Sequence, residues 1–135
     1  MSGQTVTGLG LQFTDDNKFC YALSGVIPTA GSQSSAGTQT LLFTTLSYYA
    51  IIKVIFSNDL TSVSANEYYA IKFNDVVVYQ AENEHNLDTV TNPSIIHIII
   101  PPFTKVETLA GSSGDSMQTT TIISGEVGMS QRVGN

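Results

Sequence analysis

The two histidines are the residues of this chain best suited to acid–base chemistry, and the first lies among carboxylates. His85 belongs to the polar stretch from Gln80 to Asn92, which also carries Glu82, Glu84 and Asp88. Carboxylate oxygens in such a loop could hold a cation. The stretch lacks the Asp-x-Asx-x-Asx-Gly series of a calcium loop and has no glycine. We interpret it as a solvated acidic loop, with cation binding as the alternative, and predict no metal and no cofactor.

His97 stands within the most apolar run of the chain, Ile95 to Phe103, which ends in a double proline and Phe103. Nucleophilic catalysis needs a Ser or Cys within reach of such a base, and the neighbouring residues offer no convincing partner. We expect a core or subunit-interface histidine rather than a catalytic, metal-binding or pH-sensing residue. If it lies on a symmetry axis, its burial in the neutral form makes assembly acid-sensitive.

Other catalytic patterns are weak. The Gly/Ser segments 29–38 and 110–116 lack the lysine and the following helix of a phosphate-binding loop, so we interpret both as turns. Paired carboxylates for glycoside hydrolysis are positioned by the fold and are not visible in a sequence. A chain with no Trp and one Arg is nevertheless a poor glycosidase. We predict that the protein is not an enzyme.

The composition describes one weakly charged domain. The chain has 135 residues, of which 41% are hydrophobic and only 12% charged, about half the usual share of about 25%. Ser and Thr fill the gap, which predicts a surface of hydroxyls and amides. Such a surface is typical of proteins packed against protein neighbours. The net charge of −6 and the scattered basic residues exclude nucleic acid as a partner.

Cysteine and hydropathy patterns set further limits. Cys20 is the single cysteine, so the fold has no internal disulfide and no Cys-cluster metal site. We interpret it as a small apolar strand residue. The N-terminus shows no signal peptide, and no apolar run approaches the length of a membrane span. We expect synthesis in a cytoplasm and no membrane partner.

The Ile-rich run reads as a central strand. Ile95, His97 and Ile99 share one face, whereas the intervening isoleucines share the other. Both faces are apolar, which predicts cover on both sides, by a second sheet and by a loop, another layer or another subunit.

The clearest hairpin joins residues 68–73 to 76–79 through Asn74-Asp75. Further short strands are separated by Gly, Ser, Pro and Asx turns, and no segment shows helical spacing with a cap. We predict an all-β fold: an antiparallel β-sandwich, jelly-roll or related Greek key, of seven to nine strands with almost no helix. A polar N-terminal arm (1–7) and a polar C-terminal tail (128–135) flank the single domain (8–127).

Two tyrosine doublets, Tyr48-Tyr49 and Tyr68-Tyr69, place one ring on each side of a strand. One ring of each pair belongs to the core, and the other is either ordinary surface or a partner contact. The residues we select as assembly contacts are Tyr48, Tyr49, Tyr68, Tyr69, His97 and Phe103.

The Ile-rich strand, the Pro-Pro-Phe, the Thr/Ser-rich turn and the closing strand Thr121 to Val127 resemble small virion proteins of tailed bacteriophages. The resemblance covers roughly residues 48–127. It implies a trimeric, jelly-roll-like capsid decoration or spike protein without catalytic residues, located in the virion. Its partners would be copies of itself and a major capsid or other virion protein.

The alternative function is a carbohydrate- or receptor-binding module of a phage fibre or tail. Its binding edge would be formed by the loops 29–38, 58–66 and 82–92. Removal of residues 1–7 discriminates the two functions, because it should abolish capsid binding by a decoration protein and leave glycan binding intact.

Overall fold

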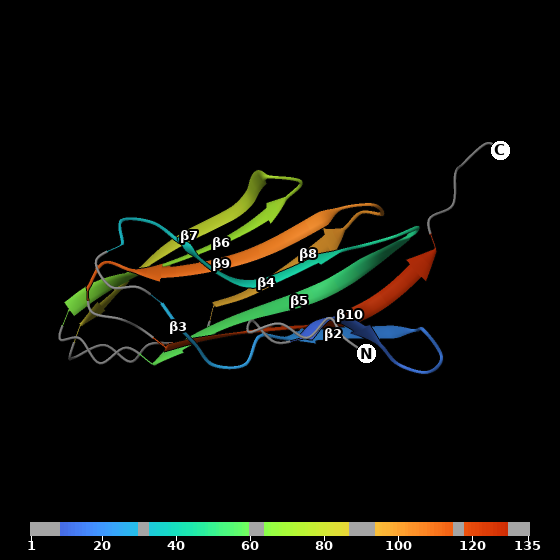
Figure 1. Cartoon of the computed structure of the whole chain (residues 1–135), viewed down its shortest axis with the longest axis horizontal. Helices are drawn as coiled ribbons and strands as arrows, with labels where there is room; N and C mark the ends of the chain where they lie inside the picture. Colours follow the sequence, from blue (N-terminus) through green and yellow to red (C-terminus); the bar gives the residue numbers. More distant parts are fainter. Residues whose placement is uncertain (1–8, 30–32, 60–63, 87–93, 115–117, 130–135) are drawn as a thin grey trace.

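The computed structural model describes residues 9–29, 33–59, 64–86, 94–114 and 118–129. These residues form two facing antiparallel sheets and contain no helix (Figure 1). The strands are β1 (Leu9–Phe13), β2 (Phe19–Leu23), β3 (Ile27–Pro28), β4 (Thr38–Thr44), β5 (Tyr48–Asp59), β6 (Ser64–Phe73), β7 (Val76–Asn86), β8 (Ser94–Ile100), β9 (Lys105–Ser112) and β10 (Gln118–Met129). The predicted all-β sandwich is confirmed, with ten strands including the two-residue β3.

The strand order is that of a jelly roll. The larger sheet runs β1-β2-β10-β5-β8, with β3 paired to β10, and the smaller sheet runs β4-β9-β6-β7. The antiparallel pairs β2–β10, β4–β9, β5–β8 and β6–β7 form one long hairpin that is folded over on itself. The pairs β5–β10 and β6–β9 then close the two sheets. This arrangement is the eight-stranded jelly roll, to which β1 adds an edge strand.

The hairpin between β6 and β7 forms the tip of that long hairpin. Asn74 and Asp75 have φ angles of 51° and 69°, the left-handed conformations of a tight two-residue turn that Asx residues tolerate. Lys105 fastens the tip, since its backbone N–H donates to Asn74 Oδ1 (2.8 Å) and its Nζ lies 2.7 Å from Asp75 Oδ1. The predicted hairpin is confirmed.

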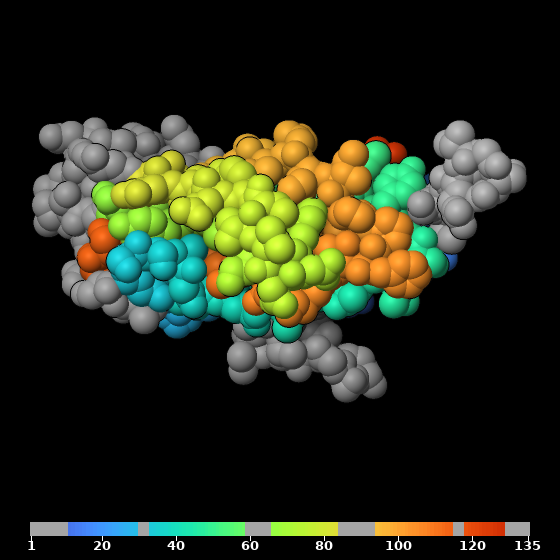
Figure 2. Space-filling model, turned by 90° about the horizontal axis from the view of Figure 1, so that it is seen from above, coloured from blue at the N-terminus to red at the C-terminus, as the bar shows by residue number. Residues whose placement is uncertain are grey.

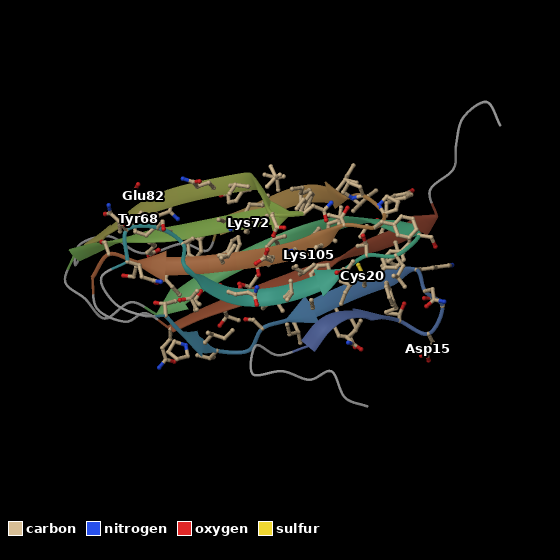
Figure 3. The ribbon with its side chains drawn as sticks, turned by 45° about the horizontal axis from the view of Figure 1, so that its top comes forward. Asp15, Cys20, Tyr68, Lys72, Glu82 and Lys105 are labelled. Carbon is tan, nitrogen blue, oxygen red and sulfur yellow. The ribbon has the colours of Figure 1, made fainter. Side chains whose placement is uncertain are left out.

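The core lies between the sheets and is built from alternating inward side chains. Phe56 of β5 stacks on Tyr69 of β6, with ring centroids 4.8 Å apart. Cys20 of β2 is buried in the same core, as the sequence predicts, and the larger core members come from both sheets (Figure 3). These are Leu41, Ile52, Val54, Ile71, Ile100, Val106 and Ile123.

Several hydroxyls lie inside the sandwich rather than at the surface. The Thr40 hydroxyl of β4 lies 2.7 Å from that of Thr108 on β9 and 2.8 Å from that of Thr121 on β10. It also donates to the Thr108 carbonyl. This network bridges the two sheets, and it satisfies polar groups that would be costly to bury alone. The high Thr content therefore serves the interior as well as the surface.

The Ile-rich strand differs from its prediction in two ways. It ends at Ile100, and it is the edge strand of the larger sheet rather than a central one. Its inner residues Ile96, Ile98 and Ile100 face the core, whereas Ile95 and Ile99 are 55% and 58% exposed. Among the described residues, only the inner face of β8 is covered, so the expected cover of the outer side by a loop, another layer or another subunit stays a prediction.

Three boundaries also differ from the sequence prediction. β7 continues to Asn86, so part of the expected acidic loop is a polar edge strand paired with β6. β9 continues to Ser112 through buried residues of the expected Gly/Ser turn. β10 reaches Met129, two residues into the expected tail. Distant strands pair with the added residues of β9 and β10, whereas the added part of β7 extends its hairpin with β6.

Candidate assembly surface

The outer face of the larger sheet is exposed and largely apolar. Strands β2, β10, β5 and β8 each turn large apolar side chains away from the core. We call this exposed surface of the four strands the outer face. Its large exposed apolar side chains are Phe19, Tyr21, Leu23, Ile51, Ile95, Ile99 and Ile122. Monomeric soluble proteins rarely expose contiguous apolar patches of this kind, and larger ones mark interaction sites.

The strand register aligns these side chains in rows across the sheet. The first row is apolar and contains Leu23, Ile122, Ile55 and Ile95. The middle row is polar and contains Tyr21, Ser124, Lys53 and His97. The third row contains Phe19, Glu126, Ile51 and Ile99. An apolar surface with a polar strip that carries hydrogen-bonding groups is typical of protein interfaces.

Charge on this face is balanced although the whole chain carries −6. Lys53 and Glu126 lie on adjacent strands, in neighbouring rows. One positive and one negative charge allow two copies of the chain to approach without local repulsion, and each can pair with the opposite charge on the other copy.

Neither the protein-family models nor the curated proteins contain a match to this chain. Its function must therefore be argued from the sequence and the geometry. Over the parts of the chain described here, no helix is long and apolar enough to cross a membrane.

His97 lies on the outer face and is exposed, opposite Lys53 of β5. The expectation of a core histidine is therefore wrong, whereas the subunit-interface alternative stays a prediction. Phe103 has a φ of 54°, and its side chain is 69% exposed, so its ring lies outside the core. It lies beyond β8 and apart from the rows of the outer face.

The four tyrosines of the two doublets differ in burial. Tyr69 is 1% exposed, which corrects its selection as an assembly contact, whereas Tyr68 is half-buried on the outer side of the smaller sheet. Tyr48 and Tyr49 are both half-buried. Tyr48 meets Phe13 edge to face at 5.0 Å, and the Tyr49 ring lies against Gly128, where a Cβ atom would collide with it.

The smaller sheet carries a polar hollow on its outer side. The segment 33–37 lies against the β6–β7 hairpin (Figure 2). A hollow of about 300 Å³ opens between them, lined by Ser34, Ser35, Tyr68, Lys72, Gln80 and Glu82, among others. Tyr68, Lys72 and Glu82 all come from the two hairpin strands (Figure 3). An aromatic ring beside hydroxyl, amide and charged groups can bind a small polar ligand.

A buried polar cluster lies between the sheets and was not predicted from the sequence. The Asn58 side chain donates to Glu67 Oε2 (2.7 Å) and to the Tyr69 hydroxyl (2.8 Å). Burial raises the pKa of Tyr69, because removal from water disfavours its ionised form. Glu67 and Tyr69 are almost completely buried, so the cluster has a structural role and is closed to a substrate. The alternation of Glu67 with Tyr69 on one strand face was the available signal.

The residues of the acidic stretch are only partly described. Glu82 is exposed on β7 and accepts a hydrogen bond from the Asn66 side chain. The side chains of Glu84 and His85, and the whole of Asp88, lie outside the described residues, as do the arm 1–7 and residues 130–135 of the tail. Within the described residues, no three His, Cys, Asp or Glu side chains gather closely enough to hold a metal ion.

Burial also raises the pKa of the Cys20 thiol, because an ionised sulfur would be poorly solvated there. This position favours an inert thiol over a nucleophile, in agreement with the interpretation of Cys20 as a small apolar strand residue.

Proposed function

We propose that this protein is a non-catalytic structural subunit of a virion, a homo-oligomeric decoration protein whose outer face is covered by protein neighbours. The exposed apolar outer face carries the proposal. Ile51 is 48% exposed in the middle of the sheet, with Ile99 beside it on β8. Burying such side chains contributes about 25 cal/mol per Å² of apolar surface removed from water, so association stabilises the protein.

The attribution to a virion is supported by the bacteriophage resemblance over residues 48–127 and agrees with the jelly-roll strand order. Jelly rolls build viral capsid proteins, lectins and cupins, so the fold alone leaves the function open. The low charge density and the apolar outer face favour a building block among these uses. The resemblance implies a trimer, and the number of copies is a quantity for measurement.

Replacing Ile51 by Lys should break the assembly. The Ile51→Lys substitution replaces an apolar contact in the middle of the outer face by an ammonium opposite Glu126 of β10. Covering that pair with a neighbouring subunit would remove both charges from water, at a desolvation cost that their attraction need not repay. We expect at least a tenfold weaker association, seen by light scattering as a shift of the mass toward the monomer.

The matched control is Leu42→Lys. The exposed fraction of Leu42, 47%, is nearly the same as that of Ile51, but Leu42 lies on β4 of the smaller sheet. Its substitution should leave the mass unchanged. Equal masses for Ile51→Lys and the unsubstituted oligomer would contradict the proposed role of the outer face.

A second candidate function, carbohydrate binding, is favoured by the polar hollow on the smaller sheet. Tyr68 would provide the ring against which a sugar packs, and Gln80 and Glu82 would provide hydrogen bonds. Under this function, Tyr68→Ala should weaken the affinity for a glycan found by array screening at least tenfold. Leu42→Ala should leave that affinity unchanged. Absence of any glycan ligand for the unsubstituted protein would eliminate this candidate.

A further inference from the structure

Among the described residues, the strand orders of the two sheets end in β1, β8, β4 and β7, and three of these four edge strands are protected against pairing with another chain. β1, β4 and β7 each contain an extra residue that interrupts the ladder with their neighbour. The irregularities fall between Leu9 and Gln12 on β1, between Gln39 and Leu41 on β4, and between Val77 and Tyr79 on β7. Such bulges twist an edge and break its hydrogen-bonding row, which is a common way to prevent edge-to-edge association.

The fourth edge strand, β8, has none of these protections. Its register with β5 is continuous from Ser94 to Ile100. Its sequence, Ser-Ile-Ile-His-Ile-Ile-Ile, contains no proline and no Lys, Arg, Asp or Glu. The side of β8 that faces away from β5 has no strand neighbour in the described sheet. A regular, apolar and uncharged edge is a template for a further strand.

We propose that β8 pairs with β8 of a second copy, antiparallel, across a two-fold axis that passes beside His97. This inference rests on the proposed homo-oligomeric function, and it requires an even number of copies, so a stable trimer would overturn it. The partner follows from the comparison of edges, because β8 is the one described edge whose row is regular enough to match another β8. Isologous contact of this kind is self-complementary, as a two-fold axis requires.

The register follows from the symmetry of the strand. His97 is the middle residue of Ser94–Ile100, so pairing over the full length sets His97 opposite His97 of the second copy. Ile95 then lies opposite Ile99 of the second copy, and two half-exposed isoleucines cover each other. The larger sheets of the two copies become one continuous sheet, with the outer faces side by side.

This register makes the pair sensitive to charge at position 97. His97 already lies opposite Lys53 of β5, flanked by the apolar Ile51 and Ile55. In the pair, the middle row reads Lys53, His97, His97 and Lys53 across the two copies. Like charges placed directly opposite each other destabilise a sheet, so His97→Lys, which sets two ammonium groups opposite each other, should separate the copies.

Cysteine cross-linking tests the register directly. Directly opposed residues have Cβ atoms about 4.5–5.5 Å apart, so His97→Cys should cross-link between copies through a short bismaleimide. Ile95→Cys alone should not, because two copies of residue 95 would be offset by four residues, about 13 Å along the strand. A mixture of Ile95→Cys and Ile99→Cys proteins should cross-link again. The unsubstituted chain controls for Cys20, which is buried.

The outcomes separate this inference from the proposed function. Cross-linking of His97→Cys at least tenfold above Ile95→Cys supports the register. Equal yields in a protein that light scattering shows to be oligomeric would overturn the β8 pair and leave the proposed function standing. A protein that stays monomeric at every concentration overturns both. The mass of His97→Lys provides a second test, in which a mass equal to that of the unsubstituted oligomer contradicts the pair.

Discussion

Replacing Gly125 by Ala should unfold this protein or cost at least about 3 kcal/mol of its free energy of unfolding, beyond the usual range for a surface substitution. Gly125 lies on β10, between β2 and β5, opposite Ile52 and Cys20. A Cβ atom there would stand 2.0 Å from the Ile51 carbonyl oxygen and 2.7 Å from the Ile52 Cα. Both are far inside the normal contact distance of about 3.5–4.0 Å. Because the colliding atoms belong to the backbone of a central strand, they can yield only if the ladder shifts.

Urea unfolding at fixed protein concentration measures this effect, with Ser124→Ala as the control. Ser124 is the neighbouring residue on β10, and its side chain is exposed on the outer face. Its substitution should change the free energy of unfolding by no more than about 0.5 kcal/mol. If Gly125→Ala changed the free energy of unfolding as little as Ser124→Ala, the close packing of β10 against β5 at Gly125 would be contradicted.

Replacing Phe56 by Ala should cost about 3–5 kcal/mol, the range measured for fully buried aromatic side chains. Phe56 is 0% exposed and stacks on Tyr69, so its removal leaves a cavity between the sheets. The loss should appear as a lower midpoint of urea unfolding and a lower melting temperature. Tyr69 would also lose the ring that helps to hold its hydroxyl near Asn58.

Phe103→Ala removes the same side chain from an exposed position and serves as the control. It should change the free energy of unfolding by less than about 1 kcal/mol. Similar losses for both variants would show that Phe56 does not lie between the sheets as described.

The sequence carries the local part of this fold well. The alternation of apolar residues and the Asn74-Asp75 turn predict the β6–β7 hairpin, because both signals act over a few residues. The jelly roll follows less directly, since the β2–β10 and β4–β9 pairs join residues far apart in the chain. Strand pairing at that distance is set by the core as a whole.

The errors have a common physical cause. The Ile run was expected in the middle of a sheet because both its faces are apolar, but apolar residues on an edge strand look the same in sequence. The polar segment after Gln80 was expected to be a loop, whereas an edge strand accepts polar side chains on its exposed side. Tyr69 and Glu67 share one buried strand face, and their partner Asn58 comes from β5. Only the pairing of distant strands brings such a cluster together.

The outer face illustrates what the sequence and the structure each contribute. The apolar residues of β2, β5, β8 and β10 are visible in the sequence, but it does not show that they form adjacent rows on one surface. The register supplies that adjacency, and it also shows that β8 is the edge without a bulge. We therefore propose that further copies of the chain cover this surface and this edge.

The mass of the unsubstituted protein in solution, measured by light scattering over a hundredfold range of concentration at pH 7.5, tests this association. We expect a mass that is a multiple of the 14.4 kDa chain and that persists on dilution into the micromolar range. A protein that remains at 14.4 kDa at every concentration would contradict it.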